Sequence, residues 1–155
     1  MEGTVVLADY AQVHAGKLNV VGAGINLVGA HTAEAPHKIN LHAAILIIVP
    51  WQSHNQAHKL TVSLGNEDGG YLPIAEAAPG VPVEPEDEGS VVGQFNAGRG
   101  PIMTPGDDSI IPLAVPIQVA VPSLGAYRVI LKIDGTEIAV ARFRVLYTPQ
   151  LVTQG

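Results

Sequence analysis

The chain contains no cysteine among its 155 residues, and this absence excludes several kinds of chemistry at once. Without thiols there is no disulfide, no thiolate metal ligand and no cysteine nucleophile. Hydrophobic residues make up 47% of the chain, which is enough for a sizeable core without such crosslinks. We therefore expect one β-sheet domain over residues 1–147, followed by a tail over residues 148–155.

Charged residues are also scarce, at 14% of the chain, and the formal net charge is -6. The few lysines and arginines are scattered, so we expect no nucleic-acid partner, because backbone contact needs clustered basic residues. A well-solvated small domain carries about 25–35% charge on its surface. Two explanations stay open: a loop surface rich in Gly, Ala and Pro, or faces that are buried against other subunits.

Long apolar runs are missing as well. The longest, residues 43–50, is far shorter than the ~20 residues that cross a bilayer as a helix. Met1 is followed by Glu2 and a strand-like run rather than by a basic and then an apolar region, so we expect no secretory signal. We expect no membrane partner, and a cytoplasmic location, or a virion location if a phage encodes the protein.

Sustained helical periodicity is absent, while 17 Gly and 12 Pro separate short runs with alternating apolar residues. This pattern predicts an all-β domain of about nine strands. The candidate strands cover residues 4–10, 17–21, 25–30, 39–49, 58–64, 71–75 (a short one), 91–97, 110–121, 126–133 and 137–147.

Three of these strands carry information about their neighbours. In residues 39–49 every odd position is apolar, and towards the end of the segment the even positions are apolar too. A strand that is covered on both faces has this pattern, so it predicts a central strand. Pro112 and Pro116 remove donors from one edge of strand 110–121, which predicts an outer strand. Strand 4–10 has no Lys, Arg or Pro to guard it, so we expect an open edge covered by the tail or by a neighbour.

Two hairpins are expected. Gly22-Ala23-Gly24 would join the strands before and after it, and Asp134-Gly135 is the strongest turn signal in the chain. The register after this second turn is open. A two-residue loop would point Ile138 inward, whereas a three-residue loop would point Phe143 and the other odd positions inward. We favour the second register because Arg142 then faces solvent.

The segment LGAYRV, residues 124–129, resembles the tyrosine corner of immunoglobulin-like domains. Tyr127 would be the corner tyrosine, and Val129 stands where an antibody domain has its second cysteine. We therefore expect an immunoglobulin-like antiparallel β-sandwich rather than a closed barrel.

Four further pieces, VVLADYAQVHAGKLNVVGAG, HAAILIIVPW, FNAGRGP and LGAYRVILKIDG, occur in this order over most of the chain. Together they resemble a family of uncharacterised proteins from actinobacteria, other bacteria and some phages. The resemblance implies an immunoglobulin-like fold. It implies no activity and supplies no site residues.

Metal-binding patterns are weak. His54 and His58 have H-x-x-x-H spacing, but they span a loop and a strand start with no acidic residue or cysteine nearby in sequence. We expect solvated loop histidines. The acidic residues at 84–88 lack the alternating spacing of a calcium loop, and we expect a solvated loop there as well.

Catalytic patterns are weaker still. No serine lies in a G-x-S-x-G elbow. Asp9 lies inside an apolar strand, and we expect it to accept backbone N–H bonds near Gln12. Trp51 follows the central strand, and we expect it in the core or at its rim. We therefore expect no catalytic residue, no cofactor-binding residue and no metal ligand, and hence no enzyme.

Three functions follow from these patterns. The preferred one is a structural or interaction protein, a homo-oligomer or a subunit of a larger assembly, such as a phage virion accessory or capsid-decoration protein. The alternative is a cytoplasmic module that binds a small molecule or a peptide. The third is an enzyme with an unrecognised site.

Overall fold

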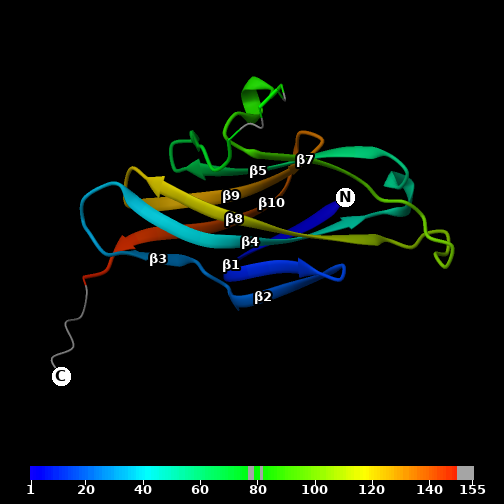
Figure 1. The fold of residues 1–155 in the computed structure, drawn as a ribbon, viewed down its shortest axis with the longest axis horizontal. Helices are drawn as coiled ribbons and strands as arrows, with labels where there is room; N and C mark the ends of the chain where they lie inside the picture. The colour runs from blue at the N-terminus through cyan, green and yellow to red at the C-terminus, as the bar shows by residue number, and fades with distance from the viewer. Residues whose placement is uncertain (77–78, 81, 150–155) are drawn as a thin grey trace.

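Two β-sheets pack face to face in the computed structural model, which describes residues 1–76, 79–80 and 82–149 (Figure 1). The sequence prediction of an all-β sandwich is confirmed, with ten strands in the described ranges. The immunoglobulin-like topology stays a prediction. No helix in these ranges is long and apolar enough to cross a membrane.

The first sheet, called sheet A here, has four strands in the order β2-β1-β4-β8, and all neighbours are antiparallel. Its strands are β1 (Glu2–His14), β2 (Lys17–Ala23), β4 (His37–Val49) and β8 (Ser109–Val121).

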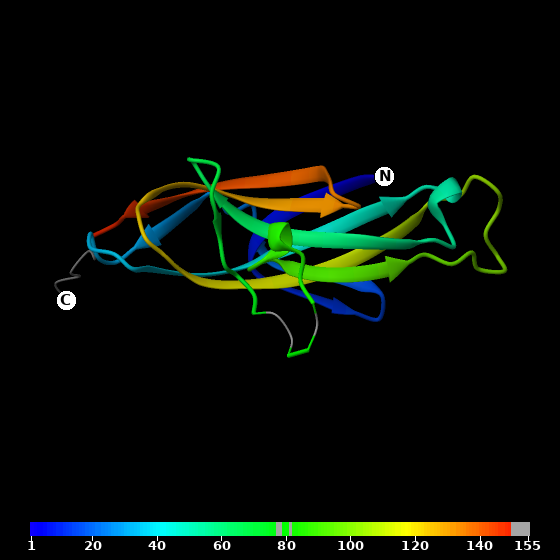
Figure 2. The ribbon, with the colours of Figure 1, turned by 90° about the horizontal axis from the view of Figure 1, so that it is seen from above.

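The second sheet, sheet B, has the order β3-β10-β9-β5-β6, and β7 also pairs with β5. Its strands are β3 (Leu27–Ala30), β5 (Ala57–Asn66), β6 (Tyr71–Leu72), β7 (Val91–Asn96), β9 (Gly125–Ile133) and β10 (Thr136–Tyr147). Two short 3-10 turns, η1 (Trp51–Ser53) and η2 (Pro85–Asp87), lie in the connections. Seen from above, η2 lies over β5 (Figure 2).

The core lies between the sheets and follows the alternation of the strands. On β4 the odd residues from Ile39 to Val49 are all buried, and on β9 Val129 and Leu131 are fully buried opposite them. The two predictions about sheet A are confirmed: β4 has a partner on each side, and the proline-bearing β8 pairs only with β4 at the edge.

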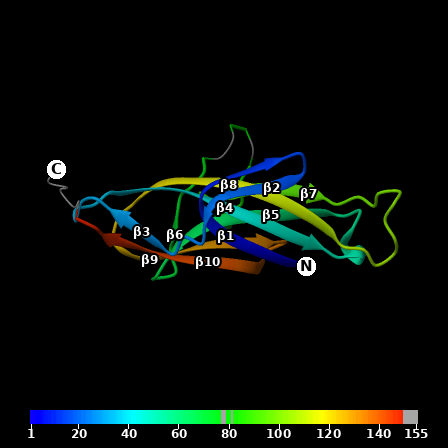
Figure 3. The ribbon, with the colours of Figure 1, turned by 90° about the horizontal axis from the view of Figure 1, so that it is seen from below.

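The prediction of an open edge on the first strand is confirmed in part. Strand β1 pairs with β4 over Glu2–Ala8 and with β2 over Ala8–His14, so residues 2–6 have no strand partner on the side away from β4. The predicted hairpin at residues 22–24 is wrong. The residues Gly22-Ala23-Gly24 do not form a hairpin. Instead, β2 folds back on β1 through a turn at Ala15 and Gly16, both at positive φ (50° and 73°), and β3 crosses to sheet B. There β3 pairs in parallel with β10, away from β2 (Figure 3).

The β9–β10 hairpin combines features of both registers that the sequence left open. Asp134 and Gly135 form a two-residue turn at positive φ, and a bulge between Glu137 and Ala139 then shifts the register by one residue. The bulge turns Phe143 inward, 3% exposed, and leaves Arg142 exposed, as predicted.

Tyr127 is buried at the start of β9, and its hydroxyl donates a hydrogen bond of 2.6 Å to the carbonyl of Ser123. Its ring stacks on Phe143 from the neighbouring strand, with centroids 5.8 Å apart. This is the local geometry expected of a tyrosine corner, because the hydroxyl ties the strand to the backbone four residues upstream.

Of the predicted tail, the structure describes Thr148 and Pro149, whereas residues 150–155 lie outside the described residues. Thr148 donates its backbone N–H to the carbonyl of Ala30 at 2.9 Å, which continues the contact between β10 and β3. The acidic residues at 84–88, predicted to lie in a solvated loop, include η2, and residues 77–78 and 81 before them lie outside the described residues.

Candidate functional site

The outer face of sheet A is apolar over most of its length, and we call it the apolar face. The registers of β1, β4 and β8 set Thr4, Leu46 and Pro112 in one row and Val6, Ala44 and Ala114 in the next. The face as a whole consists of Thr4, Val6, Ala8, Tyr10, Val21, Ala23, His42, Ala44, Leu46, Ile48, Ile110, Pro112, Ala114 and Pro116.

Side chains of different size give this face its relief. Ala8 and Ala44 are almost fully covered, at 0% and 3% exposure, although they point away from the core, because larger neighbours surround them. Leu46 and Ile110 stand out at 38% and 64% exposure. Such an uncharged area is unusual for a solvated sheet face, on which polar residues normally alternate with the buried ones.

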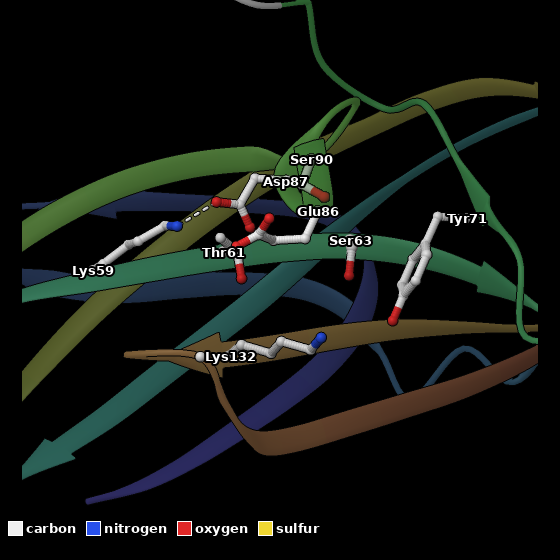
Figure 4. A pocket seen from close by; sticks show the side chains of 9 residues that line it. Lys59, Thr61, Ser63, Tyr71, Glu86, Asp87, Ser90 and Lys132 are labelled. Carbon is white, nitrogen blue, oxygen red and sulfur yellow. Dashed lines mark hydrogen bonds and ion pairs between the residues drawn. The ribbon is translucent and has the colours of Figure 1, made fainter. Parts of the chain in front are cut away.

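The opposite side of the molecule, the outer face of sheet B, carries a polar pocket. Outward-facing residues of β5 form its floor, and the segment around η2 covers them. The pocket has a volume of about 180 Å³. Its lining residues, which define the polar pocket, are Lys59, Thr61, Ser63, Tyr71, Glu86, Asp87, Ser90, Lys132 and Gly135 (Figure 4).

An ion pair holds the η2 segment against the sheet. Lys59 Nζ donates to a carboxylate oxygen of Asp87, which is itself buried at 8% exposure. This hydrogen bond raises the pKa of Lys59 above its usual value. The backbone N–H groups of Ile74 and Ala75 both bond to the carbonyl of Gly89, at 2.8 and 3.1 Å, and close the same segment on itself.

The second lysine of the pocket comes from β9. Lys132 lies directly opposite Thr61 in the register of β5 and β9, and its ammonium lies 5.8 Å from the ring centre of Tyr71. Figure 4 shows both lysines reaching the pocket from the sheet, with Glu86 and Asp87 entering from η2. Within the described ranges, no carboxylate lies within 4 Å of the Lys132 ammonium.

His58 is the best-satisfied histidine of the chain. Its Nδ1 lies 2.7 Å from a carboxylate oxygen of Asp134 and its Nε2 lies 2.8 Å from the carbonyl of Ser53. Both partners are acceptors, so the site favours the imidazolium form, in which both ring nitrogens donate. The hydrogen bond with Asp134 raises the pKa of His58 and lowers the pKa of Asp134.

The expectation that His54 and His58 are solvated is therefore wrong, since they are only 3% and 6% exposed. His54 bonds through Nε2 to the carbonyl of Val49 at 3.1 Å and faces the ring of Trp51. The two histidines brace the connection between β4 and β5. No group of three or more metal-ligating side chains occurs in the ranges that the structure describes.

Three other sequence predictions have mixed outcomes. Asp9 is exposed, and its carboxylate lies over Gly22, where an added Cβ would come within 2.1 Å of it. The expected bonds from backbone N–H groups near Gln12 to this carboxylate do not occur among the described residues. The acidic segment is not simply solvated either, because Asp87 is buried. Trp51 lies at the rim as predicted, and the guanidinium of Arg99 stacks on its ring at 3.9 Å from the centroid.

Residues 3–146 match the model of a family of unknown function (DUF6941), and this range contains nearly every strand in full. The chain belongs to this family. No curated protein matches the chain. Within this DUF6941 member, the matched range includes both the apolar face and the polar pocket, so both candidate sites lie within the family's domain.

Proposed function

We propose that this DUF6941 protein is a non-enzymatic structural and interaction protein, a subunit of a larger protein assembly. The observation that carries the proposal is the apolar face of sheet A, which is uncharged between Glu2 at one end and Lys38 at the other. A role as a phage virion accessory or capsid-decoration protein is the specific candidate, with the virion or the cytoplasm as its location.

The extent of the face supports this proposal. The apolar face spans residues 4–10 of β1, 21–23 of β2, 42–48 of β4 and 110–116 of β8. At a rise of ~3.3 Å per residue and a strand spacing of ~4.8 Å, these segments cover about 400 Å² in projection. A specific interface buries about 800 Å² on each partner and has an apolar centre within a polar rim. The face has the size of such a centre, and the polar ends of the same strands would form the rim.

The occupant that we propose is a second copy of the chain. Two sheets pack well when both faces are apolar and of similar curvature, and a two-fold axis presents the same face twice. The net charge of -6 opposes association at long range, but the face itself carries no charge that would have to be desolvated. The protruding side chains Leu46 and Ile110, at 38% and 64% exposure, would make the first contacts with the partner copy.

Leu46→Lys tests this assignment, and Leu146→Lys is its matched control. Leu46 and Leu146 are 38% and 37% exposed, and they lie on sheet A and sheet B respectively. In sedimentation over a range of concentrations we expect the wild type and Leu146→Lys to associate and Leu46→Lys to stay monomeric, with all three unfolding at similar temperatures. A wild type that is monomeric throughout, or a Leu46→Lys variant that still associates, would refute the proposal.

The alternative function, a module that binds a small molecule or a peptide, has its own support in the polar pocket of sheet B. It is compatible with subunit association, because the pocket lies on the other sheet.

A further inference from the structure

We propose that the polar pocket binds small zwitterions of the α-amino acid class. This inference is independent of the apolar face and rests on the volume of the pocket, on its unpartnered hydroxyls and on the arrangement of its charges.

The volume limits the ligand to a small molecule. A water molecule takes about 30 Å³ of liquid, so about 180 Å³ holds roughly six waters or one molecule with a handful of non-hydrogen atoms. A neighbouring groove of about 590 Å³ shares Tyr71, Glu86 and Lys132 with the pocket. A bound amino acid could therefore place its charged groups in the pocket and its side chain in this groove.

Two hydroxyls open into the pocket. Thr61 and Ser63 point outward from β5, and as whole residues both are only 6% exposed because the η2 segment covers them. In the part of the chain that the structure describes, neither hydroxyl oxygen is among the buried side-chain atoms without a partner, and neither bonds to protein, so both are open to solvent within the pocket. A hydroxyl both donates and accepts, so each can bind a polar ligand that displaces this solvent.

The charges select the class of ligand. Asp87 already pairs with Lys59, which leaves Lys132 on the sheet and Glu86 on the η2 segment. These two belong to no ion pair within the described residues. A carboxylate at Lys132 would be within the range of the Ser63 hydroxyl as a second donor, while an ammonium group would face Glu86.

Ligands with one kind of charge fit less well. A simple anion would meet the carboxylates of Glu86 and Asp87, and a simple cation would meet the ammonium groups of Lys59 and Lys132. A neutral polyol would satisfy the hydroxyls but would leave both remaining charges without a counter-charge. A zwitterion is the class that satisfies all of these groups together.

Isothermal titration of the purified protein tests the assignment with glycine, L-serine and L-glutamine as zwitterions. Acetate, ethylammonium and glycerol serve as anionic, cationic and neutral probes. We expect saturable binding for at least one amino acid and none for the three simpler probes. Glu86→Gln and Lys132→Gln should each weaken that binding at least tenfold.

Matched controls are Glu34→Gln and Lys38→Gln, which remove the same charges outside the pocket and should leave the affinity unchanged. Unfolding temperatures of all four variants verify that each one is folded. The proposal is overturned if no amino acid binds, if acetate binds as tightly as the amino acids and Glu86→Gln tightens it, or if glycerol binds and neither pocket variant changes its affinity.

Discussion

Asp134→Asn isolates the charge of the partly buried His58–Asp134 pair, because the substitution changes little else. Asp134 lies in the turn at a φ of 50°, and asparagine adopts this left-handed conformation as readily as aspartate. Its Oδ1 accepts the backbone N–H of Lys59 at 2.9 Å, and an asparagine oxygen can keep that bond. The substitution therefore removes the ionic component of the contact with His58 and preserves the turn.

The pH dependence of this contribution follows from the two pKa shifts. The pKa of His58 is raised above 6.5, so its contribution is complete below that pH and disappears as the pH rises through the folded-state value. The pKa of Asp134 is lowered below 3.8, so its contribution is complete above that pH and disappears as the pH falls through its folded-state value. Between these two limits the pair contributes most to the free energy of unfolding.

The magnitude is modest. A hydrogen bond to a charged group contributes about 1.5–3 kcal/mol and a neutral one about 0.5–1.5 kcal/mol, so removing the charge costs about 1 kcal/mol. The Asp134 side chain is 53% exposed, and solvent screening places the effect at the lower end of this range. For a chain of this size we expect a decrease in melting temperature of about 2–4 °C.

Urea unfolding of the wild type and Asp134→Asn at about pH 5.5 and about pH 9 measures this effect, with Asp108→Asn as a control in an exposed loop. We expect a gap of about 1 kcal/mol at the lower pH. The gap should close or change sign at the higher pH, where an asparagine amide can donate to the neutral Nδ1. A gap that does not change with pH would refute the ionic origin, and no gap at either pH would refute any contribution of the charge.

Three other predictions concern the core and metal dependence. Val129→Asp or Leu131→Asp places an unpaired charge at a position with 0% exposure, so we expect insoluble or unfolded protein on expression. A soluble variant as stable as the wild type would contradict the assignment of these β9 residues to the core. Tyr127→Phe removes the bond to the Ser123 carbonyl and should lower the free energy of unfolding by about 1–2 kcal/mol in urea titrations, and an unchanged value would contradict this role. A chelator should leave the melting temperature unchanged, and a large decrease would reveal a structural metal.

The features of the fold that could be predicted are those that depend on the residues of one strand alone. The apolar residues of β4 predicted its central position in sheet A, and the prolines of β8 predicted its position at the edge. A strand that is buried on both faces is apolar along its length, and proline lacks a backbone donor, so both features can be seen in the local sequence. The alternation on β9 likewise identified its buried side.

The errors arose where the outcome depends on a neighbour. Ala15 adopts a φ of 50° in the β1–β2 turn, and alanine gives no sequence signal for that conformation. The two glycines at 22 and 24 were the stronger turn signal, but they allow the chain to cross between the sheets instead. Strand β2 covers one side of β1 only from Ala8 onward, so the place of this turn decides how much of β1 keeps an open side.

The candidate sites were not predictable from spacing, because their members are distant in sequence. His58 contacts Asp134 across 76 positions, whereas motif spacing reveals only acidic partners that lie close to His58 in the chain. Lys59 and Asp87 are separated by 28 positions, and only the packing of η2 on β5 brings them together. The apolar face depends on the registers of four strands, and the low charge of the sequence had left such a face as one of two open explanations.

The two candidate surfaces are separable, since the core of the sandwich lies between them. Leu46 projects from sheet A and Lys132 from the outer side of sheet B, so association through the apolar face leaves the polar pocket accessible. Leu46→Lys should therefore abolish association and leave amino acid binding unchanged, and Lys132→Gln should do the opposite. If Leu46→Lys also abolished ligand binding while remaining folded, the pocket would have to lie at a subunit interface, and the sheet B assignment of the ligand site would be wrong.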